Sequence, residues 1–234
     1  MRVEPRSIGS VVHVIQCGTR GLNIVRSKRD SVRFSELLFY LNDSYIDPNW
    51  LKAVKFCAPF ERPDYWPDQD PLVRIFVWTL MPNHFHLLLE EIKEGGIAKF
   101  MQRLCGSMSM TFNTKYGERG SLFQGSYKSR TVNDDQYLQY LAYYIQVKNV
   151  LELFPGGLAR AMRNFDSAWS WALHYPFSSF SPYVTNTDSL IVDKNRFLEI
   201  FSDARLSKTE AREMLALHMQ HNDEKYSALA LEPW

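Results

Sequence analysis

The stretch that decides the fold is Val77–Leu89, which reads VWTLMPNHFHLLL. Two histidines, His84 and His86, flank one bulky apolar residue inside this hydrophobic run. In a β-strand, residues i and i+2 point to the same face. Both imidazoles therefore project together and Phe85 projects the other way, while the MPN tripeptide before them has the composition of a turn. The sequence predicts a strand that carries paired histidines on one face.

The histidine pair has two interpretations. Neutral imidazoles held side by side are how a strand offers two ligands to a divalent metal ion. Alternatively, a core strand can bury histidines whose hydrogen bonds are satisfied. Burying two rings requires a partner for each, and that cost is usually tolerated only for a function, which favours the metal site.

The composition is that of one ordinary domain, or one domain with an appendage. The chain has 234 residues, of which 45% are hydrophobic and 14% aromatic, enough for a substantial core. No apolar run approaches the roughly 18 residues of a membrane span, and the N-terminus lacks the apolar region of a signal peptide. Cys17, Cys57 and Cys105 are far apart, which argues against a zinc knuckle or a disulfide framework and fits a reducing cytoplasm.

Charge is unevenly distributed along the chain. The net charge is +1, yet residues 1–33 and residues 99–130 each carry a balance of +5, so the remainder is acidic. Segregated positive charge is typical of a polyanion site, whereas solvated helix faces are the simpler explanation for either segment alone. Two such segments favour nucleic acid, and Arg20, Arg103, Lys128 and Arg130 are the candidate phosphate contacts, with Gln124 and Tyr127 weaker ones.

Hydrophobic periodicity predicts four strands and three helices in the first part of the chain. They are a strand over Val11–Cys17, a helix over Ser31–Tyr45, a hairpin of Leu72–Leu80 and His84–Glu91, a helix over Ile97–Tyr116, a strand over Leu122–Val132 and a helix over residues 134–149. The β-α-β-β-α-β order of the first six elements predicts a ferredoxin-like α+β fold, in which an antiparallel sheet has helices on one face. The paired histidines then lie on a central strand, over which a following helix could lay a side chain.

The remainder of the chain differs in character. After the break at residues 155–157 come a stretch rich in Trp and Phe and a helix near Lys208–His221. We therefore expect two parts: a domain over residues 1–150 that carries the paired histidines, and a mostly helical C-terminal extension over residues 151–234 that packs on it.

The helix over residues 134–149 carries four tyrosines: Tyr137, Tyr140, Tyr143 and Tyr144. Tyrosine packs well, so most of them must be structural. A tyrosine hydroxyl can also attack a phosphodiester if a metal ion stabilises the developing charge. Beside paired histidines, the tyrosines suggest a site of phosphoryl transfer.

Several ordered blocks resemble the HUH single-tyrosine transposases, and most closely the REP-associated tyrosine transposases of bacteria. The blocks are HVIQCGTRG at 13–21, MPNHFHLLL at 81–89, RGSLFQGSYKSRTV at 119–132, DDQYLQYLAYYI at 134–145 and YPFSSFSPYV at 175–184. In the last block, Phe177 and Phe180 occupy aromatic places of a Trp-Ser-Ser-Tyr segment. The resemblance covers residues 11 to about 184.

The resemblance implies an HUH endonuclease fold and an enzyme of DNA transposition that acts on single-stranded or hairpin DNA. His84 and His86 would bind Mg²⁺ or Mn²⁺. The family pattern, set on AYYIQVKN, selects Tyr144 as the nucleophile that leaves a 5′-phosphotyrosine and a free 3′-OH. Relatives act alone or as homodimers that exchange the tyrosine helix, so this chain is expected to be a monomer or a homodimer.

The sequence departs from the family at Lys148. The family places Asn or Gln there as a third metal ligand, and an ammonium has no lone pair with which to ligate a cation. A helix irregularity could bring in Asn149, or Gln146 or water could complete the site, or metal binding could be weakened. Lys148 could also contact the scissile phosphate.

Two other functions compete with the nicking enzyme. The Lys148 departure is consistent with a domesticated protein that binds structured single strands without cleaving them. A zinc hydrolase that uses His-x-His is the third class. It is disfavoured because LLL, and not Asp-His, follows His86.

Overall fold

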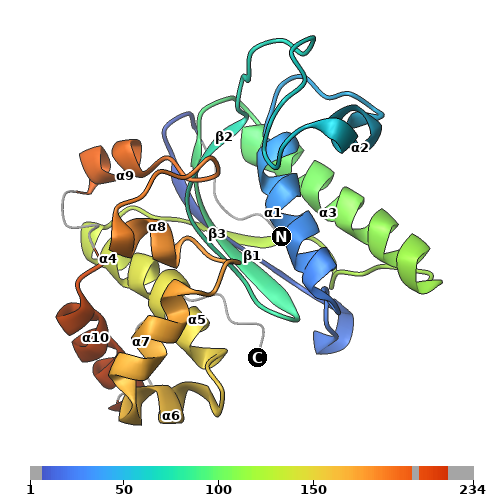
Figure 1. Cartoon of the computed structure of the whole chain (residues 1–234). Helices are drawn as coiled ribbons and strands as arrows, with labels where there is room; N and C mark the ends of the chain where they lie inside the picture. Colours follow the sequence, from blue (N-terminus) through green and yellow to red (C-terminus); the bar gives the residue numbers. More distant parts are fainter. Residues whose placement is uncertain (1–6, 202–205, 221–234) are drawn as a thin grey trace.

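The structure is a computed structural model that describes residues 7–201 and 206–220. Its sheet is antiparallel, with the strand order β2-β3-β1-β4. The strands are β1 (Val11–Cys17), β2 (Val73–Leu80), β3 (His84–Glu91) and β4 (Lys128–Thr131). Helix α1 (Lys28–Tyr40) connects β1 to β2, and α3 (Gly96–Tyr116) connects β3 to β4. The predicted ferredoxin-like α+β fold, with the histidine strand in the centre of the sheet, is confirmed (Figure 1).

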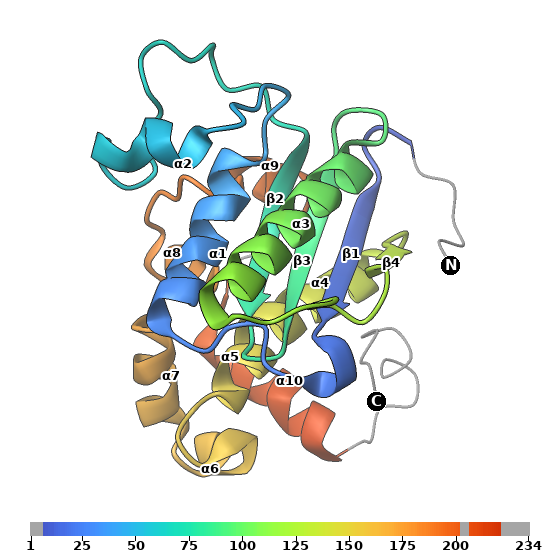
Figure 2. The same ribbon diagram turned by 90° about the vertical axis from the view of Figure 1, so that its right-hand side faces the viewer.

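Helices α1 and α3 cover one face of the sheet, where they lie side by side (Figure 2). Phe34 of α1 packs against Phe85 and Trp78, with ring centroids 5.0 and 5.9 Å apart. Helix α1 starts at a capping box, in which Ser27 accepts from the Asp30 backbone and Asp30 accepts from the Ser27 backbone. That box fixes the start of α1 three residues before the expected one.

A continuous helical segment covers the opposite face. It consists of α4 (Asp135–Tyr143), the π-helical turn η3 (Tyr144–Lys148) and α5 (Asn149–Glu152). Thr79 of β2, which pairs with His86, donates its hydroxyl to the carbonyl of Ile145 over 2.5 Å. The helices expected on one face are therefore α1 and α3, and the later helix lies over the histidines on the other face.

The described residues of the C-terminal part are mostly helical, as predicted, while residues 202–205 and 221–234 lie outside the described residues. The C-terminal part contains α6 (Gly157–Arg163), α7 (Phe165–Leu173), α8 (Phe180–Thr185), α9 (Lys194–Ile200) and α10 (Lys208–Gln220). These helices join the sheet along β2: the Ser179 amide donates to the Trp78 carbonyl, and the Tyr183 hydroxyl donates to the Phe76 carbonyl. A division of the chain at residue 150 stays a prediction.

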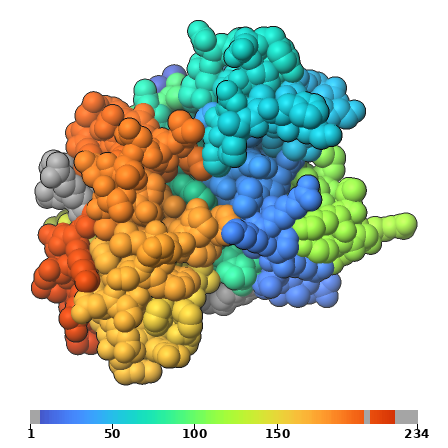
Figure 3. Space-filling view, in the orientation of Figure 1, coloured from blue at the N-terminus to red at the C-terminus, as the bar shows by residue number. Residues whose placement is uncertain are grey.

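The chain between α1 and β2 contains several prolines and is mostly irregular. It holds α2 (Trp50–Ala53) and the 3-10 turn η2 (Val54–Phe56), and in the space-filling view it projects above α1 (Figure 3). The expected strand over Leu122–Val132 forms only at its end. Gly125 has a φ of 69°, a left-handed conformation that turns the chain away from extended geometry.

None of the described helices is long and apolar enough to cross a membrane. The three cysteines are free thiols.

Candidate active site

The two histidines lie on the sheet face that α4 and η3 cover. His84 pairs with Cys17 and His86 with Ile15 of β1, so β3 is a central strand and both rings are buried. Their ring centroids are 5.0 Å apart. Phe85 between them points to the α1 face, as strand alternation predicts.

Each imidazole is held through its Nδ1 atom. The Nδ1 of His84 lies 2.7 Å from the side-chain oxygen of Asn83, and the Nδ1 of His86 lies 3.0 Å from Nε2 of His13 on β1. An amide oxygen only accepts, so Nδ1 of His84 donates and its Nε2 keeps a lone pair. The Nε2 of His86 is buried without a hydrogen-bond partner among the described residues. The two Nε2 atoms are therefore the ring atoms that could ligate a metal ion.

Both histidines are held neutral. Burial, with a contribution from the Lys148 ammonium, lowers the pKa of His84 to about 4. Burial likewise lowers the pKa of His86 well below its usual value. A neutral imidazole is the form that ligates a metal ion, so these pKa shifts favour ligation at neutral pH.

Tyr144 is the tyrosine whose ring packs against His86, with centroids 5.8 Å apart. Its side chain is 3% exposed. The other tyrosines of this helix have different surroundings: the Tyr143 hydroxyl donates to Glu210 of α10, and the Tyr140 hydroxyl lies 3.4 Å from Nδ1 of His218. The structure thus brings Tyr144 and the histidine pair together within one chain.

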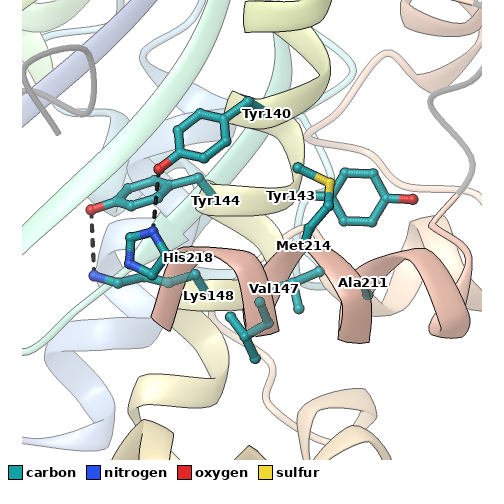
Figure 4. Close-up of a pocket in the computed structure, with 9 residues that line it drawn as sticks. Tyr140, Tyr143, Tyr144, Val147, Lys148, Ala211, Met214 and His218 are labelled. Atoms are coloured by element: carbon teal, nitrogen blue, oxygen red, sulfur yellow. Dashed lines mark hydrogen bonds between the residues drawn. The ribbon is translucent and has the colours of Figure 1, made fainter. Parts of the chain in front are cut away.

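Lys148 and helix α10 close the site around Tyr144 (Figure 4). The Lys148 ammonium donates to the Tyr144 hydroxyl over 3.4 Å and forms an ion pair with Glu152 at 2.9 Å. The ring of His218 lies 5.9 Å from that of Tyr144. A cation thus lies beside the oxygen that would act as nucleophile.

The π-helical turn changes which residues follow Tyr144 along this face. The backbone N–H of Asn149 donates to the backbone carbonyl of Tyr144, five residues earlier, as in a π-helix. Such a turn contains one residue more than an α-helical turn. Both Lys148 and Asn149 therefore lie one turn after Tyr144, on the same side of the helix. Asn149 is fully buried, and within residues 7–201 and 206–220 neither side-chain atom of its amide has a hydrogen-bond partner. An unpaired buried amide is costly, and its oxygen is a suitable ligand for Mg²⁺ or Mn²⁺.

Gln146 is also buried, but its oxygen accepts a hydrogen bond from the Ser179 hydroxyl over 3.3 Å. In the described part of the chain, no group of three or more His, Cys, Asp or Glu side chains could hold a metal ion. An uncharged side-chain oxygen could complete a metal site formed by the two histidines. The unpaired oxygen of Asn149 fits that role better than the engaged oxygen of Gln146.

Two of the four predicted phosphate contacts share the histidine face. Lys128 pairs with Ile15 and Arg130 with His13, and paired residues of neighbouring strands point to the same face. Both therefore lie on the edge strand beside the site. The Arg130 guanidinium lies 5.9 Å from the centre of the Tyr137 ring.

Arg20 lies in the loop after β1. It is exposed, in the 3-10 turn η1 (Thr19–Gly21), with a left-handed φ of 56°. The amide of Gly18 donates to the carbonyl of Asn83, which fastens this loop to the turn before His84. A left-handed backbone is unfavourable for a residue other than glycine, and such strain is often found at functional sites.

Arg103 does not join the other three basic residues. It lies on α3, across the sheet from the histidines, and donates to the backbone carbonyl of Asp43. It is half-buried, and burial lowers its pKa. The sequence placed Arg103 and Lys128 in one basic segment, whereas packing puts them on opposite faces.

The sequence did not identify His13 as part of the site. Strand alternation gives the face of His13, but its contact with His86 depends on the register between β1 and β3. Asn83 was recognised only as a turn residue.

Part of the chain is similar to a known protein family, and the fold has a similar solved structure. Residues 69–148 match the family model described as "Transposase IS200 like", a segment that contains the histidine strand and Tyr144 and ends at Lys148. This segment of the chain is similar to the IS200-like transposases. A solved structure described as a REP-associated tyrosine transposase bound to a REP hairpin is similar, with 10% identity and a TM-score of 0.41. The match covers 82% of this chain and 94% of that chain. No curated protein sequence matches.

Proposed function

We propose that the protein is a metal-dependent endonuclease and strand transferase that acts on structured single-stranded DNA in transposition. The observation that supports this most is the packing of Tyr144 on His86, whose Nε2 is buried and lacks a partner among the described residues. A potential nucleophile and a potential metal ligand are thus neighbours on the face that also carries Lys128 and Arg130.

A divalent cation would be held by Nε2 of His84, Nε2 of His86 and the side-chain oxygen of Asn149. We infer that η3 contains a one-residue insertion, which returns an amide to the ligand position of the family and makes Lys148 the inserted residue. The family resemblance implies Mg²⁺ or Mn²⁺, and the amide oxygen is a donor that suits these cations. When bound, the cation would offset negative charge on the phosphate oxygens.

Tyr144 would carry the strand during the reaction. Its phenolic oxygen forms a bond to phosphorus while the bond from phosphorus to the 3′-oxygen of the preceding nucleotide breaks. The phenolic proton is lost and the released 3′-oxygen gains one, which leaves a 5′-phosphotyrosine and a free 3′-OH. Lys148 supports this step because an ammonium beside the tyrosine oxygen stabilises a phenolate. Attack by a 3′-OH reverses the step and rejoins the strand.

Lys128, Arg130 and Arg20 would contact the phosphates of the bound strand. Lys128 and Arg130 extend along the edge strand, and Arg20 is displayed from the loop that is fastened beside His84. Because Tyr144 and His86 come from one chain, we propose that cleavage occurs in cis. A dimer is not needed to complete the site.

The test is capture of the covalent adduct. The protein is incubated with Mn²⁺ and a hairpin DNA labelled on the 3′ side of candidate cleavage points, and adducts are mapped by mass spectrometry. We expect an adduct on Tyr144 that is absent from Tyr144→Phe, although this variant still binds the hairpin. Tyr143→Phe is the matched control, because the Tyr143 hydroxyl contacts Glu210. An adduct that persists in Tyr144→Phe would contradict the assignment.

A binder that does not cleave is the second candidate, and the burial of Tyr144 supports it. With 3% of its surface exposed, Tyr144 meets DNA only if its surroundings open. Salt-sensitive hairpin binding by a wild-type protein that forms no adduct with Mn²⁺ or Mg²⁺ would favour this function.

A further inference from the structure

His13 lies in the centre of the sheet beside the histidine pair. In the register of β1 and β3, His13 pairs with Leu88 and Ile15 pairs with His86, so His13 and His86 are diagonal neighbours on one face. Both side chains are completely buried. A third histidine so close to two candidate ligands requires a physical explanation, because each buried imidazole must be desolvated.

The two rings meet edge to edge. Nε2 of His13 lies 3.0 Å from Nδ1 of His86, the ring planes differ by 9°, and the ring centroids are 5.2 Å apart. The centroid distance exceeds the distance between the nitrogens by about two ring radii, so the rings are nearly coplanar and the nitrogens face each other. This is the geometry of a hydrogen bond in which one ring donates N–H and the other accepts.

We propose that His13 is a positioning residue that accepts the Nδ1–H of His86 and so directs the Nε2 lone pair of His86 toward the metal ion. The proposal rests on the metal site described under the proposed function. The opposite tautomer would place the proton of His86 on Nε2. That atom has no acceptor among the described residues, and a protonated nitrogen cannot ligate. A neutral His13 that accepts through Nε2 carries its own proton on Nδ1.

His84 is held in the same way by a different element. Its Nδ1 lies 2.7 Å from the side-chain oxygen of Asn83, in the turn before β3. Each candidate ligand thus has its Nδ1 fixed by a neighbour, which is how outer residues of metal sites set the tautomer and orientation of ligating histidines. An imidazole acceptor does this without placing a negative charge in the core.

Two substitutions of His13 separate its role as a hydrogen-bond acceptor from its role in packing. His13→Leu fills similar space but cannot accept, so Nδ1–H of His86 is left unpaired. His13→Gln keeps an acceptor, because its amide oxygen can reach the position of the imidazole Nε2. Binding of Mn²⁺ to the full chain without DNA is measured by electron paramagnetic resonance and calorimetry, and circular dichroism reports folding. We expect about 10- to 100-fold weaker Mn²⁺ binding in His13→Leu and recovery of most of that loss in His13→Gln.

The tautomer is tested without metal and without a substitution. Long-range ¹H–¹⁵N spectra of the wild-type protein, labelled at histidine, should show the proton of His86 on Nδ1. A proton on Nε2, or wild-type Mn²⁺ affinity in a folded His13→Leu, would overturn the positioning role alone. Mn²⁺ binding that survives His84→Ala combined with His86→Ala would overturn the metal site itself, and with it this proposal.

Discussion

The ring of Tyr144 lies across the ring of His86, with centroids 5.8 Å apart and an angle of 72° between the planes. The two residues are on different elements, and η3 is held against the sheet here by the hydrogen bond from Thr79 of β2, the strand partner of His86, to Ile145. One chain therefore supplies both groups, on a buried sheet face whose exposed edge is basic.

Asn149→Leu should weaken Mn²⁺ binding by about tenfold or more, because it removes the third ligand while keeping a similar volume. Gln146→Leu is the matched control, since the Gln146 oxygen already accepts from Ser179. Calorimetry on both variants measures the difference. If Gln146→Leu loses more Mn²⁺ affinity than Asn149→Leu, then Gln146 is the ligand, and η3 does not bring Asn149 to the ligand position.

Lys148→Met should slow adduct formation by about tenfold or more, because the ammonium beside the Tyr144 oxygen is lost. Mn²⁺ affinity should be unchanged or tighter, since the ammonium also repels a cation. Single-turnover cleavage separates the two effects. Faster cleavage in the variant would show that Lys148 only hinders the site.

Arg20→Ala, Lys128→Ala and Arg130→Ala should each lower the dependence of hairpin affinity on salt. Each lost phosphate contact reduces the slope of log K against log salt by about 0.7 for single strands. Arg103→Ala is the control: it should leave the slope unchanged and reduce thermal stability, because Arg103 binds the Asp43 carbonyl on the far face. Titrations at several salt concentrations measure the slopes. Equal slopes in all four variants would exclude Arg20, Lys128 and Arg130 as phosphate contacts.

Asp30 should make stability depend on pH in the acid range. Burial alone would raise its pKa, but hydrogen bonds from Lys115, Tyr116 and backbone amides outweigh burial and lower the pKa from 3.8 to about 2. A lowered pKa stabilises the fold above the unfolded value, and this contribution is lost as pH falls from about 4 toward 2. The melting temperature of Asp30→Asn should therefore lie below that of the wild type at pH 7, and the two should converge toward pH 2. A constant difference would contradict this origin.

The sequence could predict the features that depend on neighbouring residues or on a periodic pattern along the chain. The alternation of His84, Phe85 and His86 gave the two faces of β3, and the order of elements gave the sheet. The position of Tyr144 came from family resemblance, since four tyrosines on one helix look alike by composition. Each of these features depends on few residues at a time.

The remainder depends on contacts between distant segments. Arg103 and Lys128 belong to one basic stretch, yet α3 and β4 carry them to opposite faces. The partner of His13 follows from the strand register, which sets a diagonal contact that no local pattern contains. The sequence offered a helix irregularity as only one of several ways to replace the metal ligand that is missing at Lys148. The sequence could not decide between them, because the stability of such an irregularity depends on which side chains it buries against other segments.

The turn η3 also has a consequence for insertions and deletions. In a regular α-helix, removing one residue rotates everything after it by about 100° and carries buried side chains to the wrong face. Here the helix already contains a surplus residue, so deleting Lys148 would let η3 close into ordinary α geometry and keep α5 in phase with the core. The helical segment formed by α4, η3 and α5 should therefore tolerate deletion of one residue in η3. Deletion of one residue a turn away should cause loss of the fold.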